Sequence, residues 1–131
     1  MVDVSLKGLL WSIAAATPIF ERQGSGHFIA VASTAARRIV PNMAVYAATK
    51  AAVSALCEGL RQEWAGRFRV TTLLPGFTAT EFADHIPDDA VRVSVAAGGA
   101  IAMPPEAIAY AIEQPTSVNV EEIVVRPTAQ A

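Results

Sequence analysis

The sequence has one cysteine and no strong excess of either charge, and both absences exclude classes of protein. Cys57 alone cannot form an intramolecular disulfide or a cysteine-based metal cage, and no metal site is expected. Ten lysines and arginines stand against twelve aspartates and glutamates, and the basic residues are scattered, so no nucleic-acid partner is expected. Cys57 falls in an apolar helical pattern, which is typical of a buried, reduced thiol.

The sequence also lacks a hydrophobic run long enough to cross a membrane. Such a helix needs about 20 apolar residues in succession, and the apolar stretch near the N-terminus is interrupted by Pro18 and the charged pair after Phe20. Lys7 and the alanines at 14–16 loosely imitate a secretory signal peptide, but the apolar stretch between them is short. We therefore expect a soluble, cytoplasmic protein without a membrane partner.

What is present is an alternation of helical and strand patterns. Apolar residues recur at helical spacing, and short, almost continuously apolar runs lie between the helices. Helices are expected at 4–20, 44–64 and 104–114, and strands at 27–32, 69–74 and 122–125. The stretch from Thr78 to Gly99 is expected to be irregular or weakly helical. Strands of this composition suit a parallel sheet, and 27–32 is expected to be buried on both faces.

This order predicts an α/β fold, the C-terminal half of a Rossmann-like doubly wound parallel sheet. No glycine-rich phosphate loop follows a first strand in the sequence. Residues 1–131 are therefore expected to form a partial domain that lacks the N-terminal dinucleotide-binding half.

Polar residues follow two of the expected strands, where open parallel sheets bind ligands. Ser33 comes directly after the first strand, and Pro75-Gly76 ends the second, with Thr78 and Thr80 close behind. Tyr46 and Lys50 are four residues apart at the start of the long helix, so they share one face. An ammonium one turn away stabilises a phenolate, and a serine hydroxyl stabilises negative charge developing on a carbonyl oxygen.

Each of these features also has a purely structural explanation. A tyrosine and a lysine four apart often pack as an aromatic ring beside a solvated amine, and a serine after a strand is often a helix cap. A Pro-Gly pair is common in turns that have no role in binding or catalysis. It is their joint order that favours chemistry, and neither His27 nor His85 has a convincing catalytic partner.

Three segments resemble the short-chain dehydrogenase/reductase superfamily. They are Gly26 to Ser33 (GHFIAVAS), Val45 to Ala52 (VYAATKAA) and Leu74 to Thr80 (LPGFTAT). The final stretch, from Ile112 to Thr128, looks like the branch of NADP-dependent 3-hydroxy acid dehydrogenases. The resemblance implies an NAD(P)-dependent oxidoreductase, with NADP slightly favoured, that transfers hydride between the nicotinamide and a carbonyl or alcohol substrate.

The resemblance also implies roles for individual residues. Tyr46 would be the proton donor and acceptor, Ser33 would orient the substrate carbonyl, and Lys50 would hold the nicotinamide ribose. The backbone of 75–78, which includes Pro75, Gly76 and Thr78, would contact the nicotinamide end of the cofactor together with the Thr80 hydroxyl. The helices 4–20 and 44–64 correspond to those that pair in homodimers or tetramers of this family. The stretch 78–102 would form a substrate lid whose small apolar residues suit a ligand that is not strongly anionic.

Two departures leave alternatives open. Ser5 stands where the family usually has the asparagine of its catalytic tetrad. The missing dinucleotide-binding half leads us to expect that the isolated chain is inactive with a dinucleotide cofactor. It also admits a second class of function, a truncated, non-catalytic dimerisation module. An extended-type epimerase or dehydratase uses the same tyrosine–lysine pair, but the Pro-Gly segment and the short C-terminal region favour the reductase.

Overall fold

Three parallel strands form the sheet of the computed structural model, which describes residues 1–130; Ala131, the last residue of the expected domain, lies outside them. The strands are β1 (His27–Val31), β2 (Arg69–Pro75) and β3 (Glu122–Val125), in the order β1-β2-β3. His27 lies opposite Arg69, and Leu73 lies opposite Ile123. The predicted α/β architecture with a parallel sheet is confirmed.

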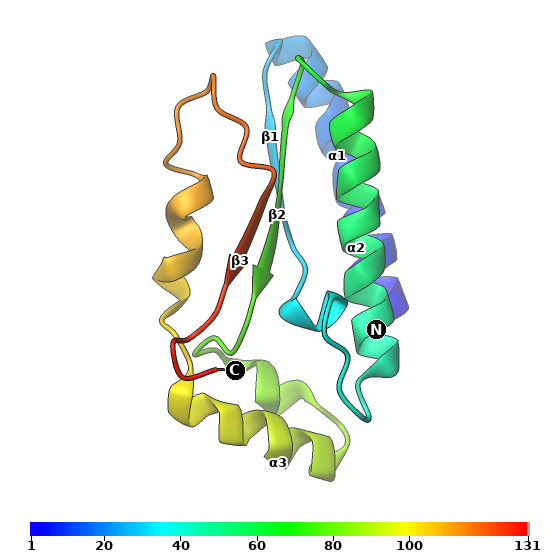
Figure 1. Cartoon of the computed structure of the whole chain (residues 1–131). Helices are drawn as coiled ribbons and strands as arrows, with labels where there is room; N and C mark the ends of the chain where they lie inside the picture. Colours follow the sequence, from blue (N-terminus) through cyan, green and yellow to red (C-terminus); the bar gives the residue numbers. More distant parts are fainter. Residues whose placement is uncertain (131) are drawn as a thin grey trace.

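The two long helices cover one face of this sheet, as Figure 1 shows. They are α1 (Gly8–Gln23) and α2 (Ala44–Glu63). The C-cap residue is Gly24 for α1 and Trp64 for α2. Gly24 ends α1 in the left-handed conformation with φ of 69°, which glycine adopts without a Cβ clash. On the other side of β3 the chain from Pro105 to Val118 returns to the sheet (Figure 1).

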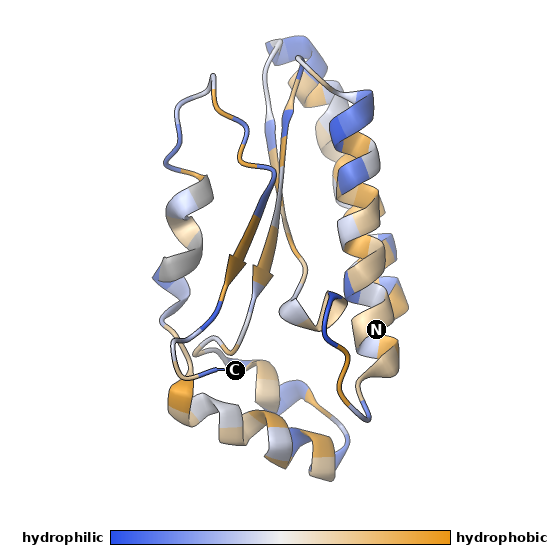
Figure 2. Cartoon of the chain, viewed as in Figure 1, coloured by the Kyte–Doolittle hydropathy of each residue, from blue (hydrophilic) through white to orange (hydrophobic). Residues whose placement is uncertain are grey.

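The core lies between β2 and the two helices. The helical spacing of apolar residues expected at 44–64 faces this core, because Val53, Leu60 and Trp64 are buried and the half-buried Leu56 packs against it. Burying one such side chain contributes about 1.5–3 kcal/mol. The hydrophobic colouring is strongest along the carboxyl-terminal parts of β2 and β3 in Figure 2. At the amino-terminal end of the sheet, four aromatic rings pack with centroids 4.8–5.6 Å apart: Phe20, Phe28, Trp64 and Phe68.

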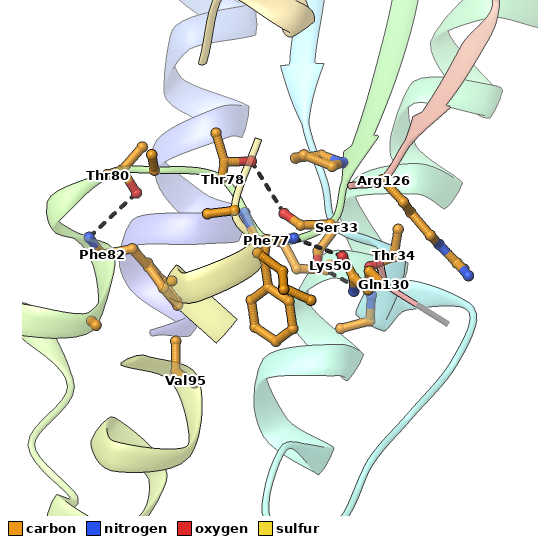
Figure 3. Close-up of a pocket in the computed structure, with 18 of the residues that line it drawn as sticks. Ser33, Thr34, Lys50, Phe77, Thr78, Thr80, Phe82, Val95, Arg126 and Gln130 are labelled. Carbon is orange, nitrogen blue, oxygen red and sulfur yellow. Dashed lines mark hydrogen bonds between the residues drawn. The ribbon is translucent and has the colours of Figure 1, made fainter. Parts of the chain in front are cut away.

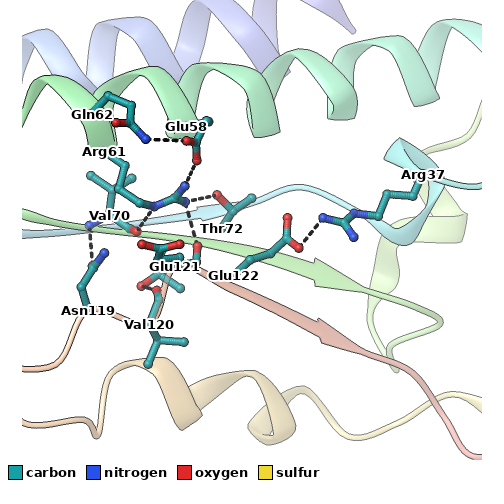
Figure 4. Close-up of polar contacts among 11 residues, drawn as sticks. Arg37, Glu58, Arg61, Gln62, Val70, Thr72, Asn119, Val120, Glu121 and Glu122 are labelled. Atoms are coloured by element: carbon teal, nitrogen blue, oxygen red, sulfur yellow. Dashed lines mark hydrogen bonds and ion pairs between the residues drawn. The ribbon is translucent and has the colours of Figure 1, made fainter.

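One buried arginine ties α2 to the sheet (Figure 4). The Arg61 guanidinium donates to the carbonyl oxygens of Val70, at 3.3 Å, and Glu121, at 2.8 Å, and pairs with the Glu58 carboxylate. Its side chain is only 12% exposed, so these partners compensate the removal of its charge from water. Arg37 forms a second ion pair, with Glu122 at the start of β3.

Strand β1 is less buried than its sequence suggested. The expectation of burial on both faces is wrong, because Val31 is 51% exposed and only Ala30 within the strand is fully buried. The cause is position, since β1 lies at an edge of the described sheet and β2 takes the central place. An almost wholly apolar run therefore does not by itself distinguish an edge strand from a central one.

The first helix begins with an irregular turn that its apolar periodicity did not reveal. Residues Asp3–Lys7 form a π-helix, η1, in which the Gly8 N–H bonds to the Asp3 carbonyl oxygen. Ser5, in the middle of η1, is half-buried. The regular helix then extends to Gln23, three residues beyond the predicted end.

The stretch after β2 is more ordered than expected. It contains the 3-10 helices η3 (Glu81–His85) and η4 (Gly98–Ile101) and a regular helix, α3 (Asp89–Ala97). Asp88 starts α3 by accepting the Val91 N–H at 3.0 Å. The expected helix 104–114 is instead the shorter 3-10 helix η5 (Pro105–Ala111), and a further one, η2 (Thr34–Ala36), follows β1. No helix within residues 1–130 is long and apolar enough to cross a membrane.

Candidate active site

The carboxyl ends of the three strands open into one cavity of about 850 Å³, with α3 beneath it (Figures 1 and 3). Every residue singled out in the sequence for catalysis or cofactor contact lines this cavity: Ser33, Tyr46, Lys50, Pro75, Gly76, Thr78 and Thr80. The fold thus brings together three segments that are up to 47 positions apart in the chain (from 33 to 80). Its volume is that of an ordinary small-molecule or cofactor site.

Ser33 is placed by the end of β1 and caps the short helix η2. Its Oγ accepts the Ala35 N–H at 3.1 Å, and the residue is only 9% exposed. A hydroxyl has one proton to donate and two lone pairs, so accepting this bond leaves the proton of Ser33 free for a ligand oxygen. Ser33 is thus both a structural cap and an available donor.

Tyr46 and Lys50 lie one turn apart near the start of α2. The Lys50 Nζ is 5.9 Å from the centre of the Tyr46 ring and donates to the Val31 carbonyl oxygen at 2.9 Å. Burial lowers the pKa of Lys50 from its ordinary value, because the ammonium has lost part of its hydration. The predicted shared face is therefore confirmed, and the end of β1 supports the amine.

The turn after β2 presents its backbone in a fixed orientation. The Phe77 carbonyl oxygen accepts the Met103 N–H at 2.9 Å, and the Ala79 N–H donates to the Met103 carbonyl at 2.9 Å. In a trans peptide the C=O and the following N–H point in opposite directions. The Thr78 N–H therefore points away from Met103, and within the described chain it meets no protein acceptor.

The two threonines of this turn have structural bonds of their own. The Thr78 hydroxyl donates to the Gly76 carbonyl oxygen at 3.1 Å. The Thr80 hydroxyl accepts the Phe82 N–H at 3.4 Å and so caps η3 (Figure 3). Both side chains line the cavity, yet each one also stabilises the local backbone.

Sequence reasoning missed several residues of this cavity. The Phe82 ring packs on the Tyr46 ring, with centroids 5.8 Å apart. Arg38, Arg126 and Gln130 also line the cavity. The position of Arg126, directly after the last strand, is the same signal that identified Ser33, and it was available in the sequence.

No histidine or cysteine within residues 1–130 lines the cavity. No group of three or more His, Cys, Asp or Glu side chains in the described part of the chain could hold a metal ion. His27 lies in β1, where its Nε2 is 2.8 Å from the Thr71 hydroxyl. Cys57 is buried in the core, and burial raises the pKa of its thiol.

Known proteins with similar sequences are oxidoreductases. An oxidoreductase of Staphylococcus saprophyticus is 42% identical over 138 aligned positions, which include all of this chain and 56% of the relative. A glycine betaine reductase of Emericella nidulans is 39% identical over 132 positions, which include 96% of this chain and 10% of that protein. The chain spans about half the length of the bacterial relatives it matches.

Solved structures agree over the whole chain. The closed form of serine dehydrogenase complexed with NADP+ has a TM-score of 0.89 and 30% identity, and the chain covers 56% of it. An alcohol dehydrogenase from Thermococcus sibiricus, complexed with 5-hydroxy-NADP, has a TM-score of 0.81 and 27% identity, with 54% covered. Residues 1–91 match the family model described as short chain dehydrogenase. With this match over more than half its length, the chain belongs to the short-chain dehydrogenase family.

Proposed function

We propose that this chain carries the catalytic centre of an NADP-dependent oxidoreductase that interconverts a carbonyl and an alcohol. The observation that carries the proposal is the convergence of Ser33, Tyr46 and Lys50 on one cavity with the turn after β2. Phenol, amine and hydroxyl together form a set that can move a proton and stabilise charge on oxygen. No second set of this kind lines the cavity in the described residues.

The three side chains have distinct roles in this proposal. The Tyr46 hydroxyl gives a proton to the substrate oxygen during reduction and takes it back during oxidation. The free proton of Ser33 binds the same oxygen and orients the carbonyl. Lys50 supplies a positive charge beside the tyrosine, and its Nζ, which gives one N–H to the Val31 carbonyl oxygen, keeps two further donors for a ribose hydroxyl.

The residues fit the nicotinamide end of a dinucleotide. The Thr78 N–H points away from Met103 and suits a carboxamide oxygen, and the Pro75, Gly76, Thr78 and Thr80 turn lines the same cavity. When bound, the nicotinamide supplies or accepts the hydride. NADP rather than NAD is proposed, because the structures of two similar enzymes contain NADP+ or a derivative of it.

A 3-hydroxy acid is the proposed alcohol substrate. Arg38, Lys50 and Arg126 line the cavity, and no aspartate or glutamate within residues 1–130 does, although the chain as a whole has a net charge of −2. The lid stretch itself contributes only neutral residues to the lining, so the positive charge comes from segments outside it. A substrate carboxylate would find complementary charge there. Similarity to a serine dehydrogenase, whose named substrate is a 3-hydroxy acid, supports the same class.

Self-association through α1 and α2 is also proposed. Apolar side chains stand exposed on these helices and on η1, with Val4 at 80%, Trp11 at 75% and Val45 at 62%. Single exposed apolar residues are ordinary, but several on two helices that cover the same face of a sheet favour an interface. The non-catalytic alternative would use this same surface. Self-association therefore fits both functions, and only binding and catalysis at the cavity distinguish the oxidoreductase from the dimerisation module.

The test is an NMR titration of the chain with nicotinamide mononucleotide, which contains only the half of the cofactor that this cavity fits. We expect saturable binding that shifts the amides of Tyr46, Lys50 and Thr78. Tyr46→Phe should keep this binding while oxidation of a 3-hydroxy acid, with oxidised nicotinamide mononucleotide as the hydride acceptor, falls about 10²- to 10⁴-fold. Tyr110→Phe is the matched control, since Tyr110 is 56% exposed and lies outside the cavity. Absence of binding, or an unchanged rate in Tyr46→Phe, contradicts the proposal.

A further inference from the structure

The segment after β3 binds the backbone of the turn after β2. The Gly76 N–H donates to the Val125 carbonyl oxygen at 2.7 Å, which continues the sheet pairing by one residue. The next donor, the Phe77 N–H, has no strand opposite it. It donates instead to the side-chain Oε1 of Gln130, at 2.9 Å (Figure 3).

Gln130 is itself held in place. Its own N–H donates to the Pro127 carbonyl oxygen at 2.9 Å, which closes a turn, and Pro127 is buried. The glutamine oxygen comes so close to the turn that a Cβ on residue 76 would lie 2.1 Å from it. The absence of a side chain at Gly76 is therefore what admits Gln130 to this position.

Gln130 and Met103 together fix two peptide planes in succession. Gln130 holds the Phe77 N–H, and with it the plane between Gly76 and Phe77. Met103 holds the Phe77 carbonyl, and with it the plane between Phe77 and Thr78. Because the Thr78 N–H belongs to that second plane, Met103 sets its direction, and Gln130 restricts rotation at the Phe77 Cα, where the two planes meet. A donor that is already aimed loses no free energy to reorientation when a ligand binds.

We propose that Gln130 is a positioning residue that aims the Thr78 N–H at the carboxamide of the nicotinamide. It touches neither reacting atom, and acts through the Phe77 backbone. The inference rests on the proposed function for its ligand, but the contact between Gln130 and Phe77 does not. The segment 126–130 is accordingly part of the binding site and not a free tail.

The test compares two substitutions of nearly equal length. Gln130→Met keeps the reach of the side chain but removes its oxygen acceptor, while Gln130→Glu keeps an oxygen at the same reach. Hydrogen exchange of the Phe77 amide and the dissociation constant of nicotinamide mononucleotide are measured by NMR in each variant. We expect Gln130→Met to accelerate the exchange and to weaken binding about five- to tenfold, the effect of one hydrogen bond, and Gln130→Glu to restore both.

Three results decide between the possibilities. Wild-type exchange and affinity in Gln130→Met overturn the proposal, and equal losses in both variants overturn it as well, because they show a role in packing alone. If the wild-type chain binds no nicotinamide mononucleotide, the proposed function fails, and Phe77 exchange still decides the contact. Unchanged exchange in Gln130→Met then overturns the contact with Phe77, and accelerated exchange that Gln130→Glu reverses supports it.

Discussion

The Lys50 ammonium donates a hydrogen bond of 2.9 Å to the carbonyl oxygen of Val31, the last residue of β1. This bond joins the first turns of α2 to the carboxyl end of an edge strand. It also places a partly buried amine beside the Tyr46 ring, 5.9 Å from its centre. The Lys50 ammonium thus stabilises the fold through this hydrogen bond, and in the proposed chemistry it supplies the positive charge beside Tyr46.

Substituting Lys50 by methionine separates these two roles. Val31 is half-exposed, so water replaces the lost donor at its carbonyl, and methionine removes the cost of burying a charge. The free energy of unfolding, measured by urea denaturation, should change by no more than about 1 kcal/mol. The affinity for nicotinamide mononucleotide should fall at least about tenfold, since the ribose loses a charged partner.

Lys7→Met is the matched control for this experiment. Lys7 lies in η1, outside the cavity, with its side chain 63% exposed and paired with Asp3. Its substitution should leave the affinity for nicotinamide mononucleotide unchanged. A Lys50→Met chain that binds nicotinamide mononucleotide as tightly as the wild type would show that the amine does not contact the cofactor.

Replacing Gly76 by alanine should expel the Gln130 side chain from its place. The added Cβ would lie 2.1 Å from a glutamine oxygen, and the end of a long side chain moves more readily than backbone does. The expected loss is about 1 kcal/mol of unfolding free energy, the value of one hydrogen bond. In a double-mutant cycle by urea denaturation, Gln130→Ala should then cost almost nothing further in the Gly76→Ala background. Additive losses would mean that the glycine is required for some other reason.

The contact between Gln130 and Phe77 could not be predicted from the sequence, whereas much of the site could. The elements of the site could be predicted, because β-branched runs, helical periodicity and the spacing of Tyr46 and Lys50 are local signals. Their meeting at the carboxyl ends of parallel strands follows from topology. The Gln130 contact joins residues 53 positions apart through a side chain that no motif distinguishes. Only the folded chain brings them together.

Of two other differences between expectation and structure, one has a local cause that the sequence contained. Asp88 followed by a second aspartate is a helix-start signal, and it begins α3 within the stretch expected to be irregular. The exposure of Val31 could not be predicted in this way, because edge strands and central strands can have the same apolar sequence pattern. Periodicity describes the faces of a strand and says nothing about its neighbours in the sheet.

Charge introduced on the exposed face of α1 should disrupt self-association. Trp11 is 75% exposed and borders a small apolar hollow with Lys7, Leu10 and Ala14. A tryptophan at the centre of an interface commonly contributes 2 kcal/mol or more, so Trp11→Glu should raise the dimer dissociation constant at least about thirtyfold. Sedimentation velocity over a concentration series measures it. Val93→Glu is the control, since Val93 is 67% exposed on α3. Equal behaviour of the two variants would remove α1 from the interface.

The folded chain should become more stable as the pH rises through the range just below 6.5, on account of His27. Burial, and next the charge of Arg69, lower the pKa of His27 below its ordinary value of 6.5. The Thr71 hydroxyl donates its one proton to the Val120 carbonyl at 2.6 Å, so it accepts from the His27 Nε2–H. The folded state therefore already has its hydrogen bond with neutral histidine. Between the lowered pKa and 6.5 the unfolded chain binds more protons than the folded chain does, and acid favours unfolding there.

His27→Gln isolates this effect, because glutamine keeps an N–H donor and does not titrate. Urea midpoints of wild type and variant should be compared from pH 5 to about pH 8, a range that spans the ordinary histidine pKa. The wild-type midpoint should rise more steeply with pH than that of the variant, and the two curves should run parallel above about pH 7.5, where histidine is neutral in both states. His85→Gln controls for the only other histidine in the chain and should keep the steeper wild-type rise. Parallel curves for wild type and His27→Gln over the whole range would show that His27 does not cause the dependence.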